Sequence, residues 1–133
     1  MILDPSLKLE AVLAGAVAAN QPDCNVFYVD WNPQGNKAKP APFRVALNST
    51  TDVTILAAPS QAYIREILRI AIYNRDTASV TVLIKTDDAT TERPICRATL
   101  LTLETLHFEN AEGWYVTTST GGRKEGGVSV PGT

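Results

Sequence analysis

The sequence is poor in the residues that enzymes and metalloproteins most often use. It has one histidine and two cysteines in 133 residues. The cysteines, Cys24 and Cys96, lie far apart in the chain, which excludes a local Cys-x-x-Cys metal or redox motif. Because no feature indicates an oxidising compartment, we expect both to be free thiols packed as small apolar groups.

Long apolar runs and an excess of positive charge are also absent. The most apolar stretch, AVLAGAVAA at residues 11–19, is well short of the roughly 20 residues of a membrane helix. The opening MILDPSLKLE lacks the basic start and apolar run of a secretory signal. The net charge of −2 provides no positive field to attract nucleic acid or an anionic membrane. We therefore expect a soluble protein, made in the cytoplasm, that binds neither nucleic acid nor membrane.

Catalytic motifs are missing as well. His107 lies in a strand-like run, on the face opposite Leu106 and Phe108, and no Gly-x-Ser-x-Gly elbow supplies a nucleophile for it. No phosphate-binding glycine loop leads into a helix. The glycine cluster at residues 121–127 is interpreted as a source of flexibility. We expect neither an enzyme nor a cofactor.

Acidic residues gather at Asp87, Asp88 and Glu92, which raises the question of a divalent metal. Calcium needs six to eight oxygen ligands, and the glycine that shapes an EF-hand loop is missing here. A solvated hairpin turn explains the same residues. We predict no metal site.

The sequence does contain a regular series of strand-like runs. Its length suits one domain, and its 44% hydrophobic and 20% charged residues are typical of globular proteins. Runs rich in Val, Ile, Leu, Thr and Tyr recur about every ten residues and end at turn-forming residues. This pattern predicts an all-β fold, a single antiparallel β-sandwich of eight or nine strands. The runs are Leu7–Leu13, Asn25–Trp31, Phe43–Leu47, Val53–Leu56, Tyr63–Tyr73, Val80–Lys85, Ile95–Leu101, Thr105–Phe108 and Trp114–Thr118.

Only the run Tyr63–Tyr73 is ambiguous between helix and strand. Glu66, Leu68 and Arg69 are good helix formers. A strand, however, explains the period-two spacing of apolar residues and the turn signal that follows at residues 74–76. We predict a strand whose buried face carries Ile64, Leu68, Ile70 and Ile72.

Three segments are poor in core-forming residues. Met1–Ser6 is predicted to be an N-terminal arm, Asn32–Pro42 a surface loop, and residues 119–133 a glycine-rich tail that follows a domain at 1–118. Such segments become ordered when a partner supplies the missing surface. We predict that they make most contacts with neighbouring protein chains, through Leu3, Asp4, Pro5, Lys37, Lys39, Arg123 and Lys124.

Trp31, Trp114 and Tyr115 have two interpretations. Their strand context favours packing in the core or at a subunit interface. If they were instead exposed around a shallow groove, they would indicate a surface that stacks on sugars.

The order of features between Val53 and Val116 resembles that of a group of small structural proteins of tailed phages. The features are Ala57-Ala58-Pro59, the run Ile64–Tyr73 closing on Asn74-Arg75-Asp76-Thr77, Val80-Thr81-Val82, Arg93, Thr99-Leu100, Glu104-Thr105-Leu106 and Gly113-Trp114-Tyr115-Val116. The starts of such proteins are similar to Leu3-Asp4-Pro5-Ser6-Leu7-Lys8, Gly15-Ala16-Val17 and Tyr28-Val29-Asp30. The loop at residues 32–42 departs from the pattern, because it is rich in proline and lysine.

Some members of that group resemble capsid cement, or decoration, proteins, which are jelly-roll domains that oligomerise and clamp neighbouring capsid subunits. The resemblance implies a jelly-roll sandwich on the capsid exterior of a virion. Its implied partners are the major capsid protein and copies of itself, as a dimer or trimer. Other members belong to tail fibres or baseplates, so the alternative is a receptor- or glycan-binding module of a tail fibre or spike. No catalytic or ligand-binding residue is implied.

Overall fold

The computed structural model describes residues 1–130, and these contain strands but no helix. The twelve strands are β1 (Ile2–Leu3), β2 (Lys8–Leu13), β3 (Asp23–Trp31), β4 (Ala41–Ala46), β5 (Val53–Leu56), β6 (Ile64–Tyr73), β7 (Val80–Asp87), β8 (Glu92–Leu100), β9 (Thr105–Glu109), β10 (Gly113–Thr117), β11 (Arg123–Lys124) and β12 (Val128–Ser129). The predicted all-β class is confirmed. Each of the nine predicted runs overlaps one strand from β2 to β10, and β1, β11 and β12 are additional.

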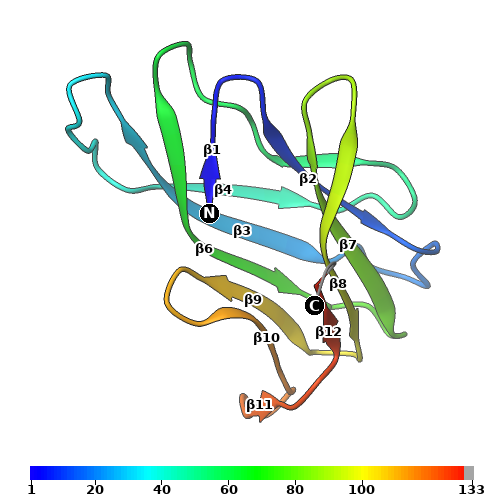
Figure 1. Ribbon diagram of the computed structural model, residues 1–133. Coiled ribbons are helices and arrows are strands. Elements are labelled where there is room, and N and C mark those ends of the chain that lie inside the picture. The colour runs from blue at the N-terminus through cyan, green and yellow to red at the C-terminus, as the bar shows by residue number, and fades with distance from the viewer. Residues whose placement is uncertain (131–133) are drawn as a thin grey trace.

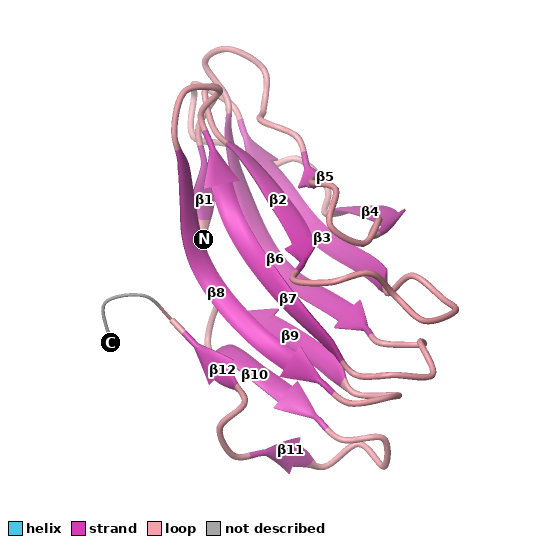
Figure 2. Cartoon of the chain, turned by 90° about the vertical axis from the view of Figure 1, so that its right-hand side faces the viewer, coloured by secondary structure: helices cyan, strands magenta, loops and turns pink. Residues whose placement is uncertain are grey.

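The strands form two antiparallel sheets in a sandwich-like arrangement (Figures 1 and 2). The larger sheet has the order β11-β10-β9-β6-β3-β4, with β1 beside β6. The smaller sheet has the order β12-β8-β7-β2-β5. Several connections cross from one sheet to the other, so that strands adjacent in the chain often lie in different sheets.

One apolar core joins the two sheets. Inward-facing side chains alternate with outward-facing ones along each strand, as half-buried strands require. The larger sheet contributes Val26, Ile70, Ile72 and Leu106, and the smaller sheet contributes Leu9, Val82, Ile84 and Cys96, all of them buried.

A β-bulge in β6 changes the predicted face of that strand. Phe27 of β3 pairs with Arg69, whereas its neighbour Tyr28 pairs with Ile67, so that Leu68 has no partner on β3. The extra residue reverses the alternation in the first half of β6. Ile67 is therefore buried and Ile64 is 40% exposed. The prediction that Ile64 lies on the buried face was wrong.

The N-terminal segment is a strand and not a free arm. β9 pairs with residues 69–73 of β6, which leaves the edge of the first half of β6 open on that side. β1 fills it, with Ile2 opposite Glu66 and Leu3 opposite Arg65. Leu3 is completely buried in the core. The arm prediction for Met1–Ser6 was wrong because an open strand edge and a core site for leucine both lie within the chain's reach.

The described part of the predicted tail is also folded. β11 pairs with β10, and β12 pairs with β8, so the segment runs from the edge of the larger sheet to the edge of the smaller one (Figure 2). Gly126 and Gly127 turn the chain between them with φ values of 72° and 80°, a region that glycine enters without strain. Residues 119–130 are thus no free tail, and residues 131–133 of that prediction lie outside the described residues.

A buried carboxylate holds the loop between β2 and β3. Asp76, 1% exposed, accepts hydrogen bonds from the backbone N–H groups of Ala18, Ala19 and Asn20 at 2.8–3.0 Å. These bonds stabilise the charged form and lower the pKa of Asp76 to about 2. The loop is therefore tied to the β6–β7 turn, although its own sequence is rich in alanine and has few core-forming residues.

Candidate functional site

The predicted partner-binding residues do not form one site. The β1–β2 turn, which holds Asp4 and Pro5, and the β3–β4 loop, which holds Lys37 and Lys39, lie at one end of the domain (Figure 1). β11, formed by Arg123 and Lys124, lies at the opposite end (Figure 1). Leu3 belongs to the core.

Several of these side chains are already engaged within the domain. The Nζ atom of Lys124 lies 3.3 Å from a carboxylate oxygen of Glu104, a residue that is only 4% exposed. Lys37 sits over the ring of Trp31, 4.7 Å from its centroid. Leu3, which is completely buried, cannot contact a partner, and this corrects its predicted role. Lys124 is one-third exposed and contributes an ion pair to the domain.

A more promising surface, which the sequence did not predict, lies on the outer face of the larger sheet, the face turned away from the smaller sheet. The register places Ala71 of β6 opposite His107 of β9, and His107 opposite Tyr115 of β10. Directly opposite residues share a face, so these side chains lie in one row. We call the surface around this row the aromatic–arginine face, and it consists of Phe27, Arg69, Tyr73, His107, Tyr115 and Arg123.

Ring and cation contacts order this face. The rings of His107 and Tyr115 stack with centroids 4.8 Å apart and planes 13° apart. The guanidinium of Arg123 lies over the ring of Tyr115, 4.2 Å from its centroid, and also donates a hydrogen bond to Glu112 at 3.0 Å. Phe27 and Tyr73 remain exposed beside them. Arg123, one of the predicted residues, therefore does lie on a candidate interaction surface.

The protonation state of the face follows from its burial. Partial burial of the ring, together with the nearby charge of Arg69, lowers the pKa of His107. Burial and the carboxylate of Glu109 raise the pKa of Tyr115. Both side chains are therefore neutral at pH 7, and the fixed charges of the row are those of the arginines and Glu109.

His107 also forms a hydrogen bond with a hydroxyl group, which raises the question of a catalytic base. Its Nε2 lies 2.9 Å from Oγ1 of Thr117, which is the geometry of a nucleophile and base pair. The Nδ1 atom, however, is buried and has no hydrogen-bond partner among residues 1–130. A triad needs an acid at that position to orient the ring. The Thr117–His107 pair thus lacks its third member.

The three aromatic residues that could stack on sugars do not lie close together on one surface. Trp114 packs against Phe108, with ring centroids 5.0 Å apart, on the core side of β10. Tyr115, its neighbour in the strand, lies on the outer face. Trp31 is opposite Ile64 at the far end of the sheet, where its Nε1 donates to Glu66 at 3.1 Å. These positions provide no common stacking platform.

A surface hollow of about 380 Å³ follows β3 and β4 and is lined by Asp23, Cys24, Asn25, Arg44, Val45 and Ala46. A smaller one of about 170 Å³ lies at the β3–β4 loop beside Lys37 and Tyr63. Neither of these two hollows is lined by a residue of the aromatic–arginine face. A rigid outer surface that carries aromatic and arginine side chains suits a protein partner.

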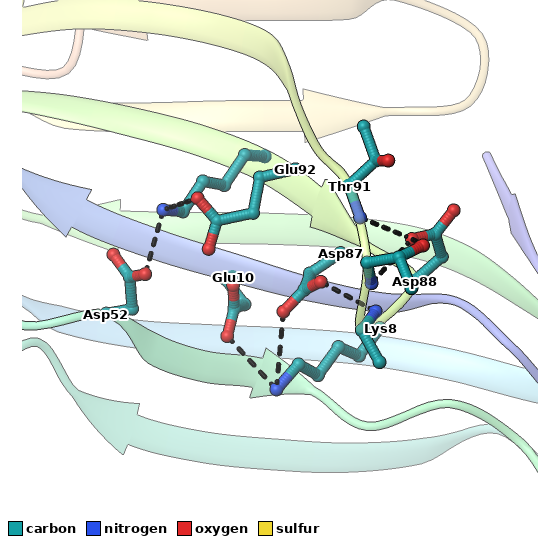
Figure 3. Close-up of polar contacts among 10 residues, drawn as sticks. Lys8, Glu10, Asp52, Asp87, Asp88, Thr91 and Glu92 are labelled. Carbon is teal, nitrogen blue, oxygen red and sulfur yellow. Dashed lines mark hydrogen bonds and ion pairs between the residues drawn. The ribbon is translucent and has the colours of Figure 1, made fainter.

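Carboxylates that could hold a cation meet on the outer face of the smaller sheet (Figure 3). One carboxylate oxygen each of Glu10, Asp87 and Glu92 lies within 4.8 Å of the others. Asp88, grouped with them in the sequence, instead accepts hydrogen bonds from Thr90 and Thr91 in its own turn, which lowers its pKa to about 2. The sequence did not predict Glu10, because that residue is distant in the chain and only strand pairing brings it close.

Comparison with protein-family models, with curated proteins and with solved structures finds no match to this chain. The described residues include no helix that is long and apolar enough to cross a membrane. The fold and the surfaces above define the class of this protein as an all-β, sandwich-like domain, and its function has to be argued from those surfaces.

Proposed function

We propose that this chain is a non-catalytic structural protein of a tailed-phage virion, a decoration protein that binds the major capsid protein and copies of itself on the capsid exterior. The observation that carries the proposal is the aromatic–arginine face. Tyr, Phe and Arg are enriched at protein interfaces, and the aromatic rings give a large contact area at low entropic cost. Here they are combined on one outer surface of a sheet.

The rigidity of that surface supports the same function. The side chains stand on paired strands, and His107, Tyr115 and Arg123 hold one another in place. A preorganised surface loses little conformational entropy on binding. The binding free energy of each copy is therefore not reduced by the entropy cost of ordering loops.

The order of the strands supports a jelly-roll fold with a permuted chain. A jelly roll has eight strands, lettered B to I, in sheets of order B-I-D-G and C-H-E-F. If β2 to β7 are lettered D to I, and β8 and β9 are B and C, the smaller sheet reads B-I-D-G and the larger reads C-H-E-F. This chain therefore has the strand neighbours of a jelly roll, but it begins at strand D, and strands B and C follow strand I.

Many weak contacts can together stabilise a shell. Specific interfaces typically bury roughly 1,200–2,000 Å² in total. A symmetric shell repeats each contact many times, and a dimer or trimer that spans two subunits gains effective concentration for its second contact. The alternative, a glycan-binding module of a tail fibre or spike, has less support because Trp31, Trp114 and Tyr115 do not come together in one stacking platform.

The test is retention on capsid shells. Shells assembled from the major capsid protein of the virion to which the proposal assigns this chain are mixed with it and sedimented, and light scattering reports whether the free protein is a dimer or trimer. Arg69→Glu, at the centre of the aromatic–arginine face, should reduce retention at least tenfold. Arg97→Glu, an exposed arginine on the smaller sheet, is the matched control and should be retained like the wild type.

The outcomes distinguish an error in the proposed function from an error in the proposed binding surface. If neither variant nor wild type sediments with shells, the decoration function is wrong. If Arg69→Glu is retained as well as Arg97→Glu, the chain binds capsids through another surface.

A further inference from the structure

Three strands place carboxylates side by side on the outer face of the smaller sheet. Glu10 lies on β2, Asp87 ends β7 and Glu92 begins β8. Asp87 is directly opposite Glu92, and Lys8 is directly opposite Asp87. Because strand pairing and not a loop sets these positions, the three groups are held close together by the sheet itself.

Glu10 is the unusual member of the group. It lies on the outer face of a sheet, yet it is only 5% exposed. Its Oε2 is 3.2 Å from Nζ of Lys8, but its Oε1 is buried and has no hydrogen-bond partner among the described residues. A buried carboxylate oxygen without a donor is costly, and a bound cation would satisfy it.

The lysines of the group do not neutralise it. Lys8 lies near Glu10 and Asp87, and Lys85 bonds Asp52 at 2.9 Å and Glu92 at 2.8 Å. Four carboxylates thus face two ammonium groups, which leaves two negative charges. A divalent cation balances them.

The lysines also leave oxygens free for such an ion. Lys8 uses Oε2 of Glu10, and Lys85 uses Oε2 of Glu92 (Figure 3). The Oε1 atom of Glu10 is therefore available without breaking either ion pair, and Glu92 has a second oxygen as well. Asp87 already accepts a hydrogen bond from the backbone of Ala89, which orients its carboxylate.

Calcium suits this group of oxygens better than magnesium. The three oxygens lie within 4.8 Å of one another, and among residues 1–130 no loop folds around them to complete an octahedron. Magnesium demands near-ideal octahedral geometry and gives up its water reluctantly. Calcium accepts irregular geometry and completes its shell with water.

We propose that Glu10, Asp87 and Glu92 bind one calcium ion, which ties β2 to the β7–β8 hairpin on the surface opposite the aromatic–arginine face. The site is independent of the proposed capsid function, because it uses other residues on the other sheet.

The test is isothermal titration of CaCl₂ into the full chain after treatment with a chelator, at constant ionic strength. The wild type should bind one ion with a Kd of about 0.1–1 mM, the range of weak calcium modules with few protein ligands. MgCl₂ should bind at least tenfold more weakly. Glu10→Gln keeps the shape of the side chain and should weaken calcium binding at least tenfold.

Two further variants make the result decisive. Glu92→Gln changes a partly exposed carboxylate, so it should fold and should also weaken binding, even if Glu10→Gln does not fold. Glu112→Gln, in the β9–β10 turn beside the larger sheet, is the matched control and should bind like the wild type. No saturable binding by the folded wild type, or equal binding by wild type, Glu10→Gln and Glu92→Gln, overturns the proposal.

Discussion

At the scale of single residues, the environment of His107 sets its behaviour. The sequence places it on the solvent side of a strand, and the structure confirms that face. The ring is nevertheless half-buried by Tyr115 and bonded to Thr117. A side chain on the outer face of a sheet is thus not automatically solvated, because neighbours in the row cover it.

His107 should make stability depend on pH. Its pKa in the folded protein is below the ordinary value of 6.5, chiefly because the ring is partly buried. As pH falls below about 6.5, the unfolded chain takes up the proton first, so folding stability decreases. The urea unfolding midpoint of the wild type should be lower at about pH 5.5 than at about pH 7.5. The difference between the two pH values should be smaller for His107→Gln. Parallel pH profiles for the two proteins would contradict this assignment.

At the scale of the element, the bulge in β6 decides which isoleucines form the core. Ile70 is completely buried, whereas Ile64 is 40% exposed, although both have the same parity in the sequence. Nothing in the alternation of residues 64–73 marks the position of the extra residue. It follows from the pairing with β3.

The pair Ile70→Ala and Ile64→Ala tests this register. Ile70→Ala should destabilise the fold by about 2–5 kcal/mol, because it leaves a cavity in the core. Ile64→Ala should cost less than about 0.5 kcal/mol, as is usual at exposed sites. Chemical denaturation measures both. Equal losses would mean that the alternation is unbroken through β6.

The C-terminal segment is the second element whose role changed. The sequence predicts a mobile arm, and deletion of residues 121–133 would then leave the unfolding midpoint unchanged. In the structure this deletion removes β11 and β12, and with them the lysine partner of the buried Glu104. An unpaired buried carboxylate and two opened strand edges are destabilising.

Deletion of residues 121–133 should therefore lower the urea midpoint. Lys124→Ala alone should lower it too, but by less, since it keeps both short strands. Circular dichroism in urea gives both values. A truncated chain as stable as the intact one would restore the view that this segment is a free arm.

At the scale of the whole molecule, one core links both sheets, so the domain should unfold as a unit. Cys24 lies in the larger sheet and Cys96 in the smaller, and both are free and buried. Burial raises the pKa of each thiol to about 12, so the reactive thiolate is scarce in the native protein.

Alkylation of the two thiols should report this cooperativity. With iodoacetamide and no reductant, neither cysteine should react in the native protein, and both should react at the same rate near the unfolding midpoint. Mass spectrometry of the modified peptides gives the two rates. Early modification of one cysteine would show that its sheet opens independently.

The sequence by itself determined the fold class, the nine main strands and the choice of strand for residues 63–73. Those features depend on local alternation and turn residues, which are properties of short segments. Tertiary structure decided the rest: the reversal of faces in β6, the docking of both ends of the chain, the row from Ala71 to Tyr115 and the approach of Glu10 to Asp87 and Glu92. Each of these features depends on which strand edges pair. The pairing of edges that are distant in the chain is set by the energy of the whole fold, so no single segment of the sequence predicts it.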